Sequence, residues 1–175
     1  MTPNTRLPAN PPIPPFKVAV PSAIFEAGVD VATTLTIQQP LLWTAETPAQ
    51  YTLNLRLVRN GENVQTKNPS IGLREVTWKD GILKVNGVAV KLRGVDRHDS
   101  DPIAGKALTE ESMILDLQLM KAANINFVRT SHYPPTPRFL SLCDLMGIYV
   151  DCEVPFGFGD AHLNDPTYQD ALYER

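Results

Sequence analysis

The segment that most constrains the fold is 86–98, because it joins two regions with different residue patterns. It begins with Asn86-Gly87, a dipeptide that favours the positive φ angles of a two-residue hairpin turn. An apolar run over 88–95 follows and is typical of a strand buried on both faces. The segment ends in a polar cluster, 96–99, which is the first group of side chains able to do chemistry. Before it the sequence predicts short strands and turns, and after it strands alternate with helices.

Residues 16–78 have the pattern of a small β-sandwich, with short strands and no helical period. The run 51–58 alternates, so we expect a strand with one buried face made of its odd-numbered side chains, Tyr51, Leu53, Leu55 and Leu57. Trp43 lies in the loop before that strand. Because large aromatic side chains are mostly buried, we expect Trp43 to fill a core. This half shows no catalytic constellation.

Composition restricts the classes of partner. The net charge of −3 leaves no large basic surface, so we expect no nucleic acid. No apolar run approaches the roughly 20 residues that cross a membrane. Residues 1–15 are proline-rich, which predicts an extended linker. They lack a signal peptide's basic start and apolar core, which favours the cytoplasm but leaves the localisation open. Cys143 and Cys152 lie among apolar residues and are expected to be buried free thiols.

Residues 79–175 follow the order strand, helix, strand, helix, strand. Thr109 is expected to cap the first helix, and Thr136, followed by proline, to cap the second, which Gly147 ends. The strands expected after these helices cover 126–130 and 148–154. This order predicts parallel strands joined by right-handed crossovers.

Polar side chains stand where each of these strands ends, and in parallel barrels such ends meet at one rim. They are Asp96, Arg97 and His98 after the first strand, Arg129, Ser131, His132 and Tyr133 after the second, and Glu153 after the third. We therefore expect groups that are distant in sequence to converge on one site.

Three segments of this half resemble a known family. Residues 86–98 are similar to the first barrel strand of glycoside hydrolase family 2, the group of β-galactosidases, β-glucuronidases and β-mannosidases, and 129–134 resemble the second strand. Residues 142–150 resemble the helix and third strand that follow, and 42–51 resemble the immunoglobulin-like domain that precedes the barrel. The resemblance implies an immunoglobulin-like β-sandwich over 16–78, followed by about three strands of an α/β (TIM) barrel over 79–175. Within the family, the sequences of these segments are most similar to those of β-galactosidases.

The family's mechanism implies a retaining hydrolase with two glutamates about 5 Å apart, one an acid/base and one a nucleophile. In the family they come from the fourth and seventh strands, so both are expected beyond Arg175. No catalytic role is assigned within this chain, which we expect to be inactive alone. The implied partner is a β-galactoside or a related carbohydrate, and the full-length protein is expected to be a homo-oligomer. Glucuronidase-type or mannosidase-type specificity stays open, as does a non-catalytic carbohydrate-binding or structural module.

Residue by residue, the resemblance gives His98 and His132 the role of binding sugar hydroxyls and Arg129 that of orienting the nucleophile and keeping it ionised. Asp96 stands where the family commonly has asparagine and is expected to bind substrate. Glu153 stays open between supporting the site and a purely structural role. Gly157 and Gly159 stand where many β-galactosidases have magnesium ligands. Because glycine has no ligand side chain, we expect no metal and no cofactor.

Overall fold

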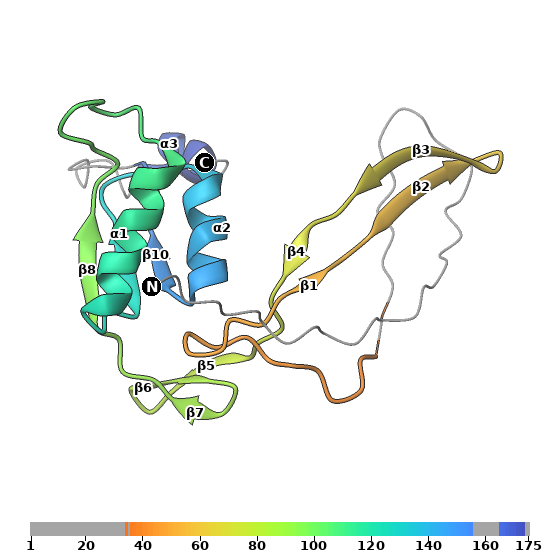
Figure 1. The fold of residues 1–175 in the computed structure, drawn as a ribbon, viewed down its shortest axis with the longest axis horizontal. Coiled ribbons are helices and arrows are strands. Elements are labelled where there is room, and N and C mark those ends of the chain that lie inside the picture. Colours follow the sequence, from red (N-terminus) through yellow and green to blue (C-terminus); the bar gives the residue numbers. More distant parts are fainter. Residues whose placement is uncertain (1–33, 35, 156–164, 174–175) are drawn as a thin grey trace.

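The computed structural model describes residues 34, 36–155 and 165–173. A layer of helices and parallel strands lies at one end of the molecule and a long two-stranded ribbon at the other, with a small antiparallel sheet and loops between them (Figure 1). The predicted linker over 1–15 and the first residues of the predicted sandwich lie outside the described residues.

The first half consists of short antiparallel strands joined by tight turns. β1 pairs with β4, β2 pairs with β3, and β5, β6 and β7 form a three-stranded meander. The bounds are β1 Tyr51–Thr52, β2 Leu55–Arg59, β3 Glu62–Lys67, β4 Ser70–Ile71, β5 Val76–Lys79, β6 Ile82–Val85 and β7 Val88–Ala89. Asn86 has a φ of 52° and Gly87 a φ of 78°, which confirms the predicted hairpin turn.

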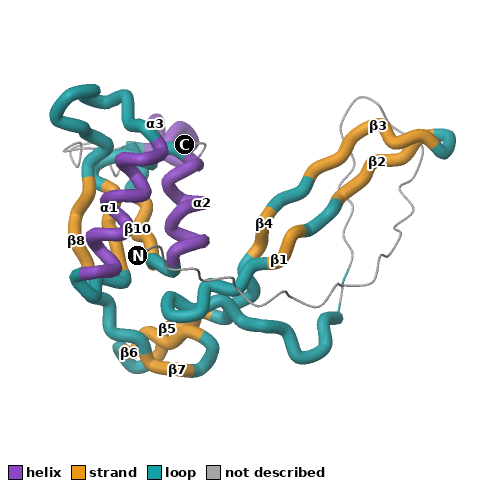
Figure 2. Tube along the Cα trace, viewed as in Figure 1, coloured by secondary structure: helices purple, strands orange, loops and turns teal. Residues whose placement is uncertain are grey.

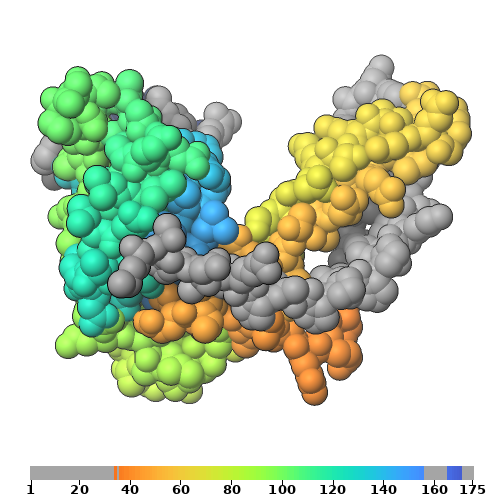
Figure 3. Space-filling model, in the orientation of Figure 1, coloured from red at the N-terminus to blue at the C-terminus, as the bar shows by residue number. Residues whose placement is uncertain are grey.

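The expected buried face of 51–58 is wrong for its second half. Tyr51 is buried, but Leu55 and Leu57 are 46% and 50% exposed. Alternation shows which side chains share a face, whereas burial needs a second layer against that face. No other described strand packs on β2 and β3, and in Figure 3 the yellow atoms of this ribbon project away from the helical part. The apolar side chains of the ribbon therefore stay exposed.

Trp43 joins the two halves and fills a core, as predicted. Its side chain is 1% exposed, and its indole Nε1–H donates a 2.8 Å hydrogen bond to the backbone oxygen of Asp144. Its ring meets that of Tyr149 edge to face, with centroids 5.5 Å apart. Asn86 Nδ2 donates to the Trp43 carbonyl at 3.0 Å, so the hairpin turn is fastened to the same point.

The second half confirms the predicted order of strands and helices. The sheet order is β10-β9-β8, both pairs are parallel, and helices α1 and α2 pack together beside the sheet (Figure 2). The bounds are β8 Gly94–Arg97, α1 Glu110–Ala122, β9 Phe127–Thr130, α2 Pro137–Met146, β10 Tyr149–Cys152 and α3 Pro166–Tyr173. The three described parallel strands do not close a barrel, which takes eight in this fold class.

The single strand expected over 88–95 is divided. Residues 88–89 end the hairpin as β7, where Val88 is 67% exposed, and Gly94 begins β8 in the parallel sheet. The apolar sequence does not show where the chain leaves one sheet and enters the next, because β7 and β8 favour the same residue types. The residues between therefore connect the two halves of the chain.

The core of the second half lies between the sheet and its two helices. Thr109 and Thr136 cap these helices, and Gly147 ends α2 at a φ of 72°, as predicted. The buried residues are Met113, Leu117, Met120, Val128, Phe139, Leu142, Cys143 and Ile148. Cys152, expected to be buried, is exposed, because β10 is an edge strand of the described sheet. Among the helices of the described residues, none is long and apolar enough to cross a membrane.

Candidate functional site

The ends of β8 and β9 bring the two predicted histidines together. The strands pair in register, with Asp96 beside Arg129, so their carboxyl ends lie at one edge of the sheet. His98 and His132 follow these ends, and their rings meet edge to face with centroids 5.1 Å apart and planes at 69°. The peptide bond before His132 is cis. Side chains 34 residues apart in sequence therefore form one polar surface.

Arg129 lies between two carboxylates on this surface. One of its guanidinium nitrogens forms an ion pair with Glu153 Oε1, and another lies 3.6 Å from Asp96 Oδ1. The second oxygen of Glu153, Oε2, lies 3.4 Å from His132 Nδ1. The four side chains therefore form a continuous chain of contacts, Asp96–Arg129–Glu153–His132, across the ends of three strands.

This chain of contacts is open to solvent, and its openness varies from member to member. The side chain of Asp96 is 63% exposed and those of Arg129 and His132 are 43% and 40% exposed, whereas that of Glu153 is 21% exposed. Ion pairs at such exposure contribute little to folding stability. The chain of contacts therefore adds little to the stability of the fold.

Arg97, one of the predicted polar cluster, points the other way. It is 7% exposed, forms ion pairs with Asp99 and, at 2.9 Å from its Nε, with Asp116 of α1, and lies 4.0 Å from the ring centroid of Phe139. Successive side chains of a strand leave it on opposite faces, so Asp96 and Arg97 are separated by the sheet. Arg97 therefore anchors the end of β8 to the helices.

The loops that follow β8 and β9 are tied together at the edge of this surface. Lys106 Nζ donates a 2.8 Å hydrogen bond to the hydroxyl of Tyr133, which in turn donates to the backbone oxygen of Asp99 at 3.5 Å. Tyr133 directly follows His132, and Asp99 directly follows His98. The contact thus links the two segments that carry the histidines.

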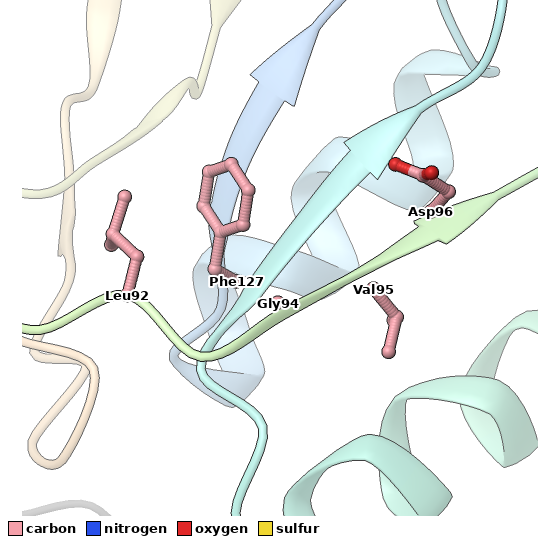
Figure 4. Close-up of a pocket in the computed structure, with 5 residues that line it drawn as sticks. All are labelled: Leu92, Gly94, Val95, Asp96 and Phe127. Carbon is pink, nitrogen blue, oxygen red and sulfur yellow. The ribbon is translucent and has the colours of Figure 1, made fainter.

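A shallow hollow of about 330 Å³ lies along the N-terminal part of β8 and β9 (Figure 4). It is lined by Leu92, Gly94, Val95, Asp96 and Phe127. A methyl group on Gly94 would lie 2.2 Å from Cδ1 of Phe127, so this ring needs a glycine beside it. The hollow is mainly apolar and shares only Asp96 with the chain of contacts.

The described part of the chain offers little support for a cysteine nucleophile or a metal site. Burial raises the pKa of the Cys143 thiol to about 12, so it stays protonated and is no nucleophile. Within residues 36–155 and 165–173 no group of three or more His, Cys, Asp or Glu side chains is placed to hold a metal. Gly157 and Gly159, at the positions discussed for magnesium, lie outside the described residues.

Sequence reasoning left the role of Glu153 open, and the structure gives it two contacts within the site. The available signal was its place after the third strand, at the same edge as Arg129 and His132. That place predicts proximity, but it does not predict that one carboxylate divides its oxygens between two partners.

Two family models match the chain. Residues 76–164 match the model described as "Glycosyl hydrolases family 2, TIM barrel domain", and residues 16–74 match the model "Glycosyl hydrolases family 2". The order of the two matches confirms the predicted fold class, a sandwich followed by the start of a barrel. The domain boundaries at 15 and 78 stay predictions.

Curated relatives are similar over two thirds of the chain. A β-galactosidase of Vibrio vulnificus (strain YJ016) is 46% identical over 118 residues, which are 67% of this chain and 11% of the relative. A β-galactosidase of Photobacterium profundum is 44% identical over 118 residues, again 67% of this chain and 12% of the relative. The chain therefore spans about a tenth of the length of these relatives.

Solved structures of glycosidases are also similar to about two thirds of this chain. A β-glucuronidase of Parabacteroides merdae is 34% identical with a TM-score of 0.64, over 68% of this chain and 15% of that one. A β-glycosidase of Bacteroides vulgatus is 33% identical with a TM-score of 0.65, over 67% of this chain and 16% of that one.

Proposed function

This chain belongs to glycosyl hydrolase family 2, and we propose that the protein it forms part of hydrolyses terminal β-galactosides with retention of configuration. The observation that carries the proposal is the pair of histidines, His98 and His132, meeting at 5.1 Å beside Arg129 at the carboxyl edge of a parallel sheet. In barrel enzymes that edge holds the active site. The choice of galactose is supported by the curated relatives, which are named β-galactosidases.

In this proposal the chain supplies the sugar-binding part of the site. The imidazoles of His98 and His132 exchange hydrogen bonds with sugar hydroxyls, and Asp96 accepts hydrogen bonds from further hydroxyls. Arg129 presents a positive charge that favours the ionised form of a neighbouring nucleophilic carboxylate. Both catalytic glutamates of a double displacement would come from outside this chain. Asp96 and Glu153 receive no catalytic role, because they stand at the ends of the first and third barrel strands, whereas the family's two glutamates come from the fourth and the seventh.

A β-glucuronide is the second candidate substrate. It is supported by the similarity to the Parabacteroides merdae structure, a β-glucuronidase. A glucuronide differs from a galactoside chiefly in carrying a carboxylate. Arg129 and His132 are 43% and 40% exposed and are cationic or able to become so. The two candidates are therefore separated by whether this surface prefers the charged sugar.

The test is a titration of the 175-residue chain, followed by NMR signals of the histidine side chains. Methyl β-D-galactoside, methyl β-D-glucuronide and methyl β-D-mannoside are added separately up to about 100 mM. We expect the galactoside to shift the His98 and His132 signals saturably, and the variant His132→Ala to abolish the response at His98 as well, because the two rings are in contact. A stronger response to the glucuronide would transfer the proposal to the second candidate.

The same samples decide between an enzyme part and a binding module. We expect no turnover of a chromogenic β-galactoside by the chain alone, because the proposed mechanism takes both carboxyl groups from elsewhere. If the backbone amide signals of residues 40–80 shift saturably while the histidine signals do not move, a carbohydrate-binding module is favoured. Turnover by the purified chain would contradict the absence of the catalytic pair.

A further inference from the structure

Glu153 is the least exposed member of the chain of contacts and is held from two sides. It directly follows β10, and its backbone N–H donates a 3.3 Å hydrogen bond to Thr130 Oγ1 on β9. Its side chain is 21% exposed, about half the exposure of Arg129 and His132, the two residues that it contacts. Glu153 therefore lies behind the surface that a ligand would touch.

The two oxygens of this carboxylate are assigned to different partners. Arg129 takes Oε1 through an ion pair, and a guanidinium can only donate. This contact fixes the carboxylate and leaves Oε2 facing His132 Nδ1 at 3.4 Å. A carboxylate oxygen and a bare ring nitrogen are both acceptors, so their lone pairs repel at that distance. The arrangement favours a proton on Nδ1 in both charge states of the ring.

The tautomer of a neutral histidine decides what its other nitrogen can do. With the proton on Nδ1, the remaining nitrogen Nε2 carries a lone pair and accepts a hydrogen bond. The ring plane is set as well, because His98 meets His132 edge to face at 69°. A hydroxyl group can donate to such a nitrogen, whereas an ether or carbonyl oxygen cannot.

We propose that Glu153 is a positioning residue that holds His132 in its Nδ1–H tautomer, so that Nε2 accepts a hydrogen bond from a sugar hydroxyl. This inference rests on the proposed function for its ligand, but the tautomer itself does not depend on any sugar. Glu153 does not touch the substrate in this arrangement. It makes His132 an acceptor that recognises hydroxyl donors.

The variant Glu153→Gln tests the proposal, since it keeps the shape of the side chain. The amide oxygen has to serve Arg129, which leaves the amide NH₂ group facing His132 Nδ1. An NH₂ group needs an acceptor, so His132 should change to the Nε2–H tautomer. Long-range ¹H–¹⁵N spectra of the imidazoles in the 175-residue chain report the tautomer directly, at a pH about two units above the ordinary histidine pKa of about 6.5.

We expect the Nδ1–H pattern at His132 in the unsubstituted chain and the Nε2–H pattern in Glu153→Gln. Glu153→Asp, which keeps the carboxylate, should retain the Nδ1–H pattern. Glu110→Gln is the matched control, because Glu110 also pairs with an arginine, Arg138, but has no histidine contact among its described interactions. It should leave His132 unchanged.

An Nε2–H pattern in the unsubstituted chain, or an unchanged Nδ1–H pattern in Glu153→Gln, would overturn the proposal. The outcome is separable from the sugar titration. A tautomer change without any sugar response would keep Glu153 as a positioning residue and refute the role of His132 in galactoside binding. A sugar response without the tautomer change would keep the role of His132 in galactoside binding and refute the role of Glu153 as a positioning residue.

Discussion

Replacing Trp43 should destabilise the whole chain, because this side chain couples its two halves. The indole is 1% exposed, bonds the Asp144 carbonyl and packs on Tyr149. Trp43→Phe removes the N–H and two ring carbon atoms. The lost hydrogen bond costs about 1 kcal/mol and the lost apolar burial about 1.5 kcal/mol, so the free energy of unfolding should fall by about 2.5 kcal/mol. Trp43→Ala should cost about 3–5 kcal/mol.

The assay is urea unfolding followed by far-UV circular dichroism, which needs no tryptophan signal. Leu42→Ala is the matched control, because Leu42 is the sequence neighbour of Trp43 and is 43% exposed. Its cost should stay within about 0.5 kcal/mol, as for most surface substitutions. If Trp43→Phe costs no more than Leu42→Ala, the ring does not couple the halves and the reasoning fails.

Two further predictions follow from ionisable groups. Arg138 Nε donates a 2.8 Å hydrogen bond to Glu110 and lowers the pKa of that carboxyl below its ordinary value of 4.5. The pair therefore contributes stability above about pH 4.5, which is lost as the pH falls through the lower pKa of the folded state, and Glu110→Gln should flatten this decline in acid unfolding curves. Burial raises the pKa of Cys143 to about 12, whereas Cys152 is exposed. A maleimide at pH 8 should label one thiol in the folded chain and two in urea.

A specific experimental result would contradict each of these two predictions. An acid unfolding curve of Glu110→Gln that parallels that of the unsubstituted chain would show that the pair does not contribute. Glu111→Gln, at the neighbouring position of the same first turn, is the control for loss of one negative charge. Rapid labelling of both thiols in the folded chain would show that Cys143 is accessible, and Cys152→Ser identifies which thiol reacts first.

Local signals in the sequence predicted local structure well. The Asn86-Gly87 pair predicted a hairpin turn, and these two residues have φ angles of 52° and 78°. Thr109 accepts from the backbone N–H of Ser112, as a helix cap does. These features depend on a few adjacent residues, so no tertiary contact is needed to specify them.

Burial was predicted less well, because it depends on what packs against a surface. Leu55 and Leu57 alternate as core residues do but are exposed, since no described layer covers their ribbon. Cys152 has apolar neighbours in sequence yet lies on an edge strand. Trp43 was predicted correctly because a large aromatic ring is costly to leave in water wherever it lies.

For the candidate site, the sequence determined which groups are present and at which edge they gather. The order of strands and helices between His98 and His132 requires parallel strands, and parallel strands place both histidines at one rim. Only the tertiary structure decided how the groups are paired. It paired Arg97 with Asp116 of α1, and it divided the carboxylate of Glu153 between Arg129 and His132. Pairing depends on side-chain direction and on distances of a few ångströms between strands, which no spacing along the chain records.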